Sequence, residues 1–324
     1  MNAPVLISGG DGFLGRALCR YFTAHGRPVV VIDDHSSSGP QPPRRFRRVI
    51  DADVARVERE AIPRVSAVLH LASPATPALF ACNAMRIMRS NIAGTEALAE
   101  IARRDGCRML FTSTSEVYGT GDPSGPPDQA FHEEQPVAHR NLTTRSCYAA
   151  AKRVGEEIVL AARRSGLDAA SLRLFNVYGP GMDPTLSTYG RVVPCFLGAV
   201  ERGEPLPIHG EGHQVRSFLW VDDFVEAVAG LVDYRGELPP VLNVGRDEPI
   251  RIEDLARLFE RAAGETLGRR RLPRPVDDPD WRRPDCTRIR KLIGWAPAVS
   301  IAEGVRLLVD EIHDIRRRDV AACR

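Results

Sequence analysis

The sequence predicts an α/β protein in which a doubly wound parallel sheet is joined to a smaller C-terminal lobe. Short apolar runs without hydrophobic–polar alternation recur through the first half of the chain, and stretches of helical periodicity separate them. A wholly apolar strand is typical of a parallel sheet that is covered on both faces. The regular alternation of strands with helices favours the doubly wound arrangement.

The first strand, turn and helix are expected at the N-terminus. Residues 3–8 (APVLIS) form an apolar run that stops at glycines, and apolar residues then recur at helical spacing from Phe13 to Ala24. Residues 28–32 (PVVVI) are continuous, β-branched and followed by Asp33, which predicts a second strand buried on both faces.

The same alternation continues to about residue 174. We expect further strands at 49–50, 67–71, 108–112 and 168–174, and helices at about 54–62, 84–104 and 146–164. The segment 119–144 is rich in Gly, Pro, Asp and His, and we interpret it as a surface loop over a cleft, because loops of this length are usually functional or mobile.

The chain from about residue 179 onward predicts the smaller lobe. Pro-rich turns there separate helices expected near 190–202, 222–232, 252–263 and 301–317. We therefore divide the chain into residues 1–178 and 179–324, with some of the second part crossing back to the sheet.

Composition argues against several classes of protein. A chain of 324 residues with 43% hydrophobic residues can form a large core, and 44 Lys plus Arg against 42 Asp plus Glu leave a formal charge of +2. This balance gives no broad electrostatic reason to expect nucleic acid or a membrane as partner. Basic runs remain at 44–48 and 269–271, where we expect solvated segments, with phosphate binding as the alternative.

The cysteines and the N-terminus favour the cytoplasm. The seven cysteines are scattered singly without a CxxC pair, which is typical of a reduced compartment and predicts no metal site. The N-terminus lacks the basic and apolar stretches of a signal peptide, and no apolar run is long enough to span a membrane.

Glycines at 9, 12 and 15 lie between the first predicted strand and helix, and this placement predicts a dinucleotide site on a Rossmann fold. Gly9 permits the tight turn, Gly12 lets the backbone approach a pyrophosphate, and Gly15 allows close packing of the helix. Asp33 ends the second strand, where a carboxylate accepts hydrogen bonds from the adenosine ribose. Because this carboxylate would repel the 2′-phosphate of NADP, we expect NAD, although the arginines at 44–45 could reach a phosphate.

Tyr148 and Lys152 are four residues apart on a predicted helix and so share one face. We expect the ammonium of Lys152 to lower the pKa of the Tyr148 phenol, so that the phenolate takes a proton from a sugar hydroxyl while hydride leaves for a nicotinamide. The pair alone is common, but it follows a dinucleotide turn and a Ser/Thr-rich strand end.

The whole chain resembles the extended short-chain dehydrogenase/reductases that act on nucleotide-sugars, and within them the UDP-glucuronate decarboxylases, or UDP-xylose synthases. The resemblance depends on the order and spacing of many motifs: GGDGFLG at 9–15, HLASPATP at 70–77, Asn91 with Gly94-Thr95, STSEVYG at 113–119, RSCYAAAKR at 145–153, LFNVYGPGM at 174–182, GRVV at 190–193, GEPLPIHGEGHQVRSF at 203–218, VDD at 221–223 and DDPDWRRPD at 277–285.

The resemblance implies a set of cofactor-binding residues. They are Gly9, Gly12, Phe13, Leu14 and Gly15 of the turn, Asp33, Asp53 and Val54 near the adenosine, Leu71, Ala72 and Ser73 along the phosphates and ribose, and Asn91, Tyr148 and Lys152 near the nicotinamide. For Asp53 a plain helix N-cap is the alternative, and Asn91 resembles a structural asparagine near the lysine.

The resemblance also implies residues that act on the substrate. Thr114, Ser115 and Glu116 match a reactive strand end, at which Thr114 would bind the hydroxyl being oxidised and Glu116 would hold a proton for the ring carbon. The substrate-binding residues are expected to be Asn176, Arg216, Arg282 or its neighbour Arg283, Arg191 and Arg145, since arginine forms bidentate bonds to phosphate.

The implied reaction is decarboxylation of UDP-glucuronate. Oxidation at C4 places a ketone β to the C6 carboxylate, so that CO2 leaves readily, and return of hydride would give UDP-xylose with NAD regenerated. Release of the 4-keto pentose with NADH is an alternative, and the family commonly forms dimers.

Several departures leave other functions open. The decarboxylases carry arginine at the place of Gly181, a Pro-Arg pair at Thr144-Arg145 and Asp-Glu-Gly at 149–151. A uronate 4-epimerase is therefore the second interpretation. A 4,6-dehydratase is less favoured because Ser115 replaces the acid that protonates the leaving hydroxyl, and an NAD-sensing binding protein is the alternative outside enzymes.

Overall fold

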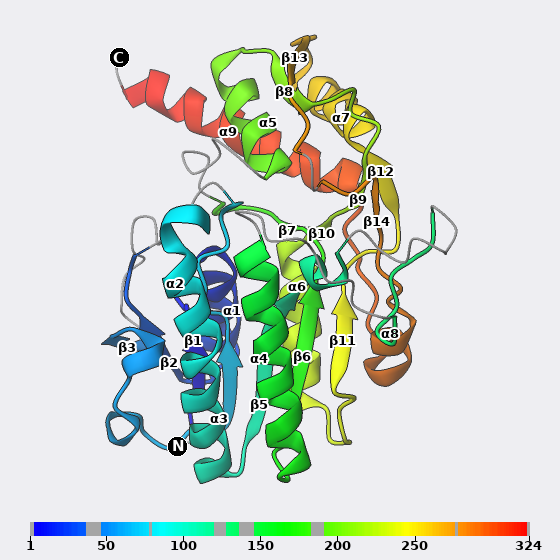
Figure 1. The fold of residues 1–324 in the computed structure, drawn as a ribbon. Helices are drawn as coiled ribbons and strands as arrows, with labels where there is room; N and C mark the ends of the chain where they lie inside the picture. Colours follow the sequence, from blue (N-terminus) through cyan, green and yellow to red (C-terminus); the bar gives the residue numbers. More distant parts are fainter. Residues whose placement is uncertain are drawn as a thin grey trace.

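The computed structural model describes residues 3–36, 47–77, 80–119, 128–135, 146–182, 191–275 and 278–322. Their centre is a parallel seven-stranded sheet with the strand order β11-β6-β5-β4-β1-β2-β3 (Figure 1). The strands are β1 (Val5–Ser8), β2 (Val29–Asp33), β3 (Arg47–Asp51), β4 (Ala67–His70), β5 (Arg108–Thr114), β6 (Ala169–Leu174) and β11 (Val241–Val244). The predicted doubly wound fold is confirmed, and the strand order reverses between β1 and β4.

Helices cover both faces of this sheet. The helices are α1 (Phe13–Ala24) and α6 (Val221–Asp233) on one face and α2 (Phe80–Asn91), α3 (Ala93–Asp105) and α4 (Ser146–Arg164) on the other. Successive strand residues point to opposite faces, so Val5 and Ile7 pack in the core under α1 whereas Leu6 packs in the core under α3. Burial on both faces explains why the strands lack polar alternation.

The C-terminal lobe lies beyond the carboxyl ends of the strands (Figure 1). Its helices are α5 (Val192–Arg202), α7 (Ile252–Ala263) and α9 (Ile301–Ala322), and its strands are β7 (Val177–Tyr178), β8 (Leu206–His209), β9 (Val215–Ser217), β10 (Leu219–Trp220), β12 (Pro249–Arg251), β13 (Arg269–Leu272) and β14 (Trp281–Arg282). The helix α8 (Thr287–Ile293) instead packs beside β11 at the edge of the sheet. Phe196 and Phe259 meet edge to face at 5.4 Å in a separate apolar core formed by α5, α7 and α9.

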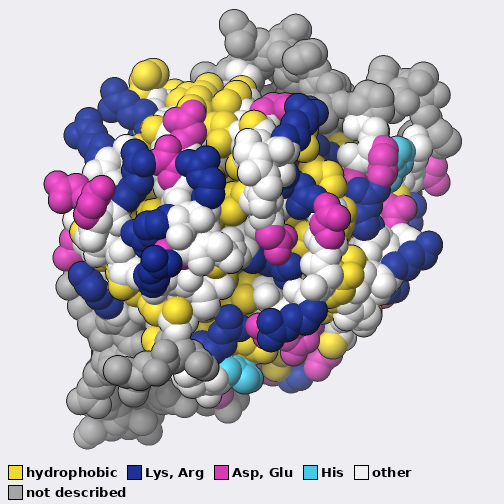
Figure 2. Space-filling model, turned by 90° about the horizontal axis from the view of Figure 1, so that it is seen from below, with side chains coloured by type: hydrophobic (Ala, Val, Ile, Leu, Met, Phe, Trp, Pro, Cys, Tyr) yellow, Lys and Arg dark blue, Asp and Glu magenta, His cyan; other side chains and the backbone are white. Residues whose placement is uncertain are grey.

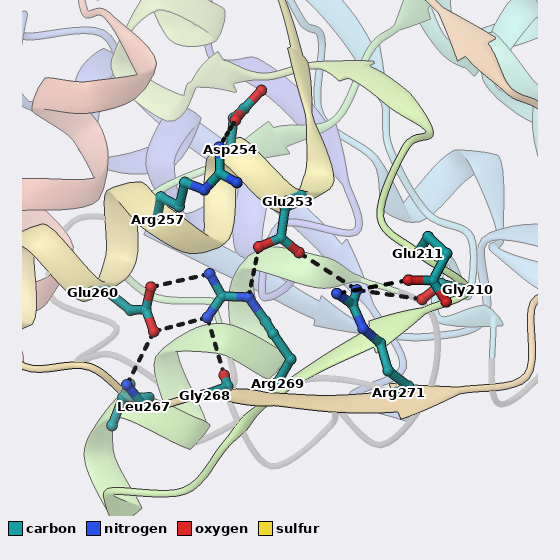
Figure 3. Close-up of polar contacts among 10 residues, drawn as sticks. All are labelled: Gly210, Glu211, Glu253, Asp254, Arg257, Glu260, Leu267, Gly268, Arg269 and Arg271. Carbon is teal, nitrogen blue, oxygen red and sulfur yellow. Dashed lines mark hydrogen bonds and ion pairs between the residues drawn. The ribbon is translucent and has the colours of Figure 1, made fainter.

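The basic run 269–271 forms a strand. Arg269 of β13 is bound on both sides by carboxylates of α7, with Glu253 at 3.0 Å and Glu260 at 2.8 Å (Figure 3). Arg271 contacts Glu253 at 3.4 Å, so this network fastens β13 to α7. The prediction that residues 269–271 form a solvated segment is therefore partly wrong, because Arg269 is half-buried.

Two predicted helices differ from the structure, and some elements of the structure were not predicted. The helix expected at 84–104 is two helices, since the backbone leaves helical geometry at Ile92, with φ −100° and ψ −79°. The helix expected at 54–62 is two short 3-10 turns, η1 (Val54–Arg56) and η2 (Arg59–Ala61), because Val57 is extended. The strand β11 was not predicted, since Asn243 interrupts its short apolar run, and the short strands of the C-terminal lobe and the helix α8 were not predicted either.

Charges of both signs are mixed on the face of the molecule seen from below in Figure 2. No helix among the described residues is both long and apolar enough to cross a bilayer.

Candidate functional site

The glycine turn between β1 and α1 is packed too closely for a side chain at Gly9 or Gly15. Gly9 has φ +73°, and a Cβ added there would lie 2.8 Å from the amide nitrogen of Ala72. A Cβ on Gly15 would lie 2.1 Å from the carbonyl oxygen of Gly9. The loop thus holds a backbone cradle at the N-terminus of α1, as a pyrophosphate requires.

Asp33 is fixed at the end of β2 by two backbone N–H groups. Its carboxylate accepts hydrogen bonds from Asp11 N at 2.9 Å and from His35 N at 2.8 Å. The side chain is 8% exposed and lines a hollow at the switch between β1 and β4. A carboxylate held there suits the two hydroxyls of an adenosine ribose.

The same hollow gathers most of the other residues predicted to bind the adenosine half. It is lined by Gly9, Gly12, Asp53, Val54, Leu71, Ala72 and Ser73. The carboxylate of Asp53 accepts a hydrogen bond from Ala55 N at 3.0 Å, so this residue also caps η1. Asn91 is fully buried and donates to Ser73 Oγ at 2.8 Å, which places it behind the wall of the hollow.

A larger cleft of about 870 Å³ continues from this hollow toward the C-terminal lobe. It brings together predicted residues from distant parts of the chain: Phe13, Leu14, Thr114, Ser115, Glu116, Tyr148, Lys152, Asn176, Arg191, Arg216 and Arg282. Arg145 lies outside the described residues.

Tyr148 projects from the first turn of α4 into this cleft. Its ring stacks on Phe80 with centroids 4.8 Å apart. Burial raises the pKa of the Tyr148 phenol to about 12, with Glu116 adding to the rise, while Arg191 and a hydrogen bond with Thr114 oppose it. The prediction that Lys152 lowers this pKa is therefore wrong. In the structure, the groups that lower the phenol pKa are the Arg191 guanidinium and the Thr114 hydroxyl.

Lys152 lies one helical turn from Tyr148 and is 2% exposed. Its ammonium donates to the Thr112 carbonyl at 2.6 Å and lies 5.9 Å from the centroid of the Tyr148 ring. Burial lowers the pKa of Lys152 to about 7, and the Glu156 carboxylate opposes that shift.

Two arginines face the cleft from the C-terminal lobe, and each is bound to a carboxylate. Arg282 forms an ion pair with Glu116 and is 4% exposed, whereas Arg216 binds Asp278 at 2.6 Å. Burial lowers the pKa of Arg216 to about 10, with Arg282 adding to the decrease and Asp278 opposing it. Two neighbouring guanidinium groups suit a diphosphate or a carboxylate.

Asn176 and Arg191 complete the walls of the cleft. Asn176 has φ +37° and its amide donates to Ser217 O at 2.8 Å, so the turn after β6 is tied to β9. Arg191 donates to Ala75 O at 3.1 Å and lies near enough to Tyr148 to act on its charge.

The model of the NAD-dependent epimerase/dehydratase family matches residues 5–245. The chain belongs to this family. It is 32% identical to UDP-glucuronic acid decarboxylase 2 of Arabidopsis thaliana, over 97% of this chain and 68% of that protein.

Solved structures agree with this membership. The UDP-glucose 4-epimerase of Thermotoga maritima is 28% identical with a TM-score of 0.85, covering 97% of this chain and 99% of that chain. MoeE5, solved with UDP-glucuronic acid and NAD, is 26% identical with a TM-score of 0.81, covering 95% and 98%. The chain is therefore an NAD-dependent enzyme on a Rossmann fold, as predicted. The glycine cradle and Asp33 fit that cofactor.

Sequence reasoning missed several cleft residues of this epimerase/dehydratase, Arg16 and Asp278 among them. Arg16 donates to Asp11 O at 2.6 Å and to Gly181 O at 2.7 Å, and it lines the cleft beside the glycine turn. The position of Arg16 directly after Gly15 in the sequence was a signal that it lies beside the glycine turn. Asp278 belongs to the DDPDWRRPD motif at 277–285, but its pairing with Arg216 had no local signal because the two residues lie 62 positions apart.

No group of three His, Cys, Asp or Glu side chains that could hold a metal occurs within the described parts of the chain.

Proposed function

We propose that this enzyme decarboxylates UDP-glucuronate to UDP-xylose. The observation that carries the proposal is the Glu116–Arg282 ion pair, which faces the same cleft as Tyr148 and Lys152. A carboxylate and a guanidinium beside the oxidation centre suit a substrate that carries its own carboxylate. The similarity to UDP-glucuronic acid decarboxylases over 97% of the chain supports the same substrate.

The cations of the cleft would bind the two anionic parts of the substrate. Arg216, with Asn176, is proposed to hold the diphosphate, and Arg282 to hold the sugar carboxylate or the diphosphate. Arg191 lines the cleft, acts on the charge of Tyr148 and would contact the sugar side. Arg145 remains a proposed contact on sequence grounds.

The chemistry begins at the C4 hydroxyl. The Tyr148 phenolate would take the hydroxyl proton while the Thr114 hydroxyl orients the same oxygen, and bound NAD supplies the acceptor for the hydride. The ketone formed at C4 is β to the C6 carboxylate, so the C5–C6 bond breaks with its electron pair delocalised as an enolate. Glu116, which pairs with Arg282 as a carboxylate, would relay a proton from water to C5. Return of the hydride to C4 would then give UDP-xylose with NAD regenerated.

The test is incubation of the full-length protein and NAD with UDP-glucuronate, with CO2, absorbance of NADH and product mass followed together. We expect CO2 without net NADH. CO2 with equal NADH would indicate release of the 4-keto pentose, and an isomer of unchanged mass would indicate a uronate 4-epimerase. Binding of NAD without turnover would favour a sensing protein.

A matched variant tests the role of the ion pair. Glu116→Gln should reduce CO2 release by about 10²-fold, because general acid–base groups contribute that much, with little change in NAD affinity. Release of CO2 at the parental rate would remove Glu116 from the mechanism.

We also propose how the chain is divided into two domains. The NAD-binding domain of residues 1–178 would close against a mainly substrate-binding lobe of residues 179–324. The chain crosses back, since α6 and β11 of the second part lie on the sheet. A homodimer in the cytoplasm stays a prediction from the sequence.

A further inference from the structure

The wall behind the reaction centre holds a buried ion pair that the mechanism above does not use. Glu156 of α4 and Arg173 of β6 have side chains that are each 3% exposed. Two hydrogen bonds of 2.8 Å join the guanidinium of Arg173 to the two carboxylate oxygens of Glu156. Such a bidentate pair fixes direction as well as distance.

Glu156 is placed directly behind Lys152. The two residues are one turn apart on α4, on the helix face that also carries Tyr148. The ammonium of Lys152 donates to Thr112 O at 2.6 Å, and the hydroxyl of Ser113, the next residue of β5, donates to Glu156 Oε1 at 2.6 Å. The carboxyl end of β5 is thus held by both side chains.

Lys152 is surrounded mainly by apolar groups and by charges that are already paired. Charged or titratable groups near it among the described residues include Tyr148 and Glu156 on α4 and His70 on β4, and Glu156 in turn binds Arg153 on α4 and Arg173 on β6. Burial, with the charge of Lys152 adding to it, lowers the pKa of His70 to about 3, so this ring is neutral near pH 7.

We propose that the Glu156–Arg173 pair is the positioning element of the reaction centre, which holds the charged ammonium of Lys152 against the end of β5 and beside Tyr148. Neither residue lines the cleft, so both act through Lys152. The inference rests on the oxidation step of the proposed function and not on which sugar is oxidised.

The composition of the chain allows a direct test. Lys152 and Lys291 are the two lysines in the sequence, and Lys291 is exposed. Full-length protein labelled with [ε-13C]lysine therefore gives one signal for each, which can be titrated by NMR with saturating NAD and without substrate. The experiment separates this inference from the proposed function, because no turnover is needed.

The decisive variant is Glu156→Gln, which removes the charge and keeps the shape. We expect Lys152 to titrate about one pH unit lower, because a nearby opposite charge favours the ammonium, while Lys291 is unchanged. If the substitution only loosened the packing around Lys152, water would reach the ammonium and the pKa of Lys152 would rise toward about 10.4. An unchanged or raised Lys152 titration in folded protein overturns the proposal.

Glu157→Gln is the matched control, because Glu157 binds the same Arg153 at 2.9 Å but has a side chain 55% exposed. In Glu157→Gln the pKa of Lys152 and the turnover should match those of the parent. A shift of the Lys152 pKa as large as that in Glu156→Gln would also overturn the proposal.

Turnover of UDP-glucuronate gives a second readout. In Glu156→Gln, kcat should fall about tenfold or more with KM little changed, because a displaced ammonium misaligns the reacting groups. The alkaline fall of activity should move to lower pH with the Lys152 titration. If that variant does not fold, Glu156→Asp replaces it: the retained charge should keep the Lys152 titration in place while kcat falls, and a parental kcat overturns the proposal.

Discussion

Tyr148 and Lys152 share one cleft, yet burial moves their proton affinities in opposite directions. It raises the pKa of the phenol to about 12 and lowers the pKa of the ammonium to about 7. Each shift disfavours the charged form, since burial removes the water that stabilises a charge. At the residue scale the proposed catalytic pair therefore depends on neighbours, chiefly Arg191 and Glu156, that oppose these shifts.

Tyr148→Phe tests the base at this scale. It should lower turnover at least about 10²-fold, the usual contribution of a general base, because the ring remains stacked on Phe80 but has no oxygen to accept the proton. NAD affinity, measured by titration calorimetry, should change little. Turnover near the parental rate would show that another group takes the proton.

The element that matters most at the next scale is the junction of β1 with α1. Its close backbone contacts leave no room for a Cβ at Gly15, whereas Gly198 in α5 faces only the flexible side chain of Arg202. A methyl group added at Gly15 would therefore meet backbone atoms, whereas one added at Gly198 would meet a side chain that can move. The helix α4 is a second element that organises the site, because it places Tyr148, Lys152 and Glu156 on one face.

Gly15→Ala should therefore weaken NAD binding at least about tenfold, or 1.4 kcal/mol, because the cradle must open to admit the methyl group. Gly198→Ala is the control and should bind NAD as the parent does. The measurement is NAD titration calorimetry of both variants, and equal affinities would contradict the argument.

At the scale of the whole molecule, we expect a buried histidine of the core to contribute to the response to acid. His70 is fully buried, with Nδ1 2.7 Å from Ser8 Oγ and Nε2 3.1 Å from Ser90 O, and its pKa falls from 6.5 to about 3. In the unfolded chain His70 binds a proton below about pH 6.5, but the folded protein does not. Its contribution to stability is therefore present above that pH and is lost as the pH falls toward 3.

Comparison with His70→Asn isolates this contribution. Between about pH 6.5 and 4.5 the parent should lose stability relative to the variant by about 1.4 kcal/mol per pH unit. The measurement is urea unfolding of both proteins across this range. Parallel profiles would show that His70 does not contribute to the acid response.

The sequence by itself determined the cofactor fold, because its signals are local. The glycines at 9, 12 and 15, the apolar strand that ends at Asp33 and the four-residue spacing of Tyr148 and Lys152 each lie within one or two elements. Periodicity placed most of the helices and the strands of the central sheet except β11 for the same reason. It failed at Ile92, where α2 and α3 separate, at β11, whose apolar run is interrupted by Asn243, and at the short strands of the C-terminal lobe.

Only the tertiary structure decided which charges meet. Glu116 and Arg282 are 166 residues apart, and Glu156 reaches Arg173 and Ser113 on two different strands. Such pairs form because parallel strands end at one edge and the C-terminal lobe folds back over it, and no spacing in the sequence records that approach. The effect of burial on the pKa of Tyr148 and Lys152 was hidden for the same reason, since burial belongs to the folded whole.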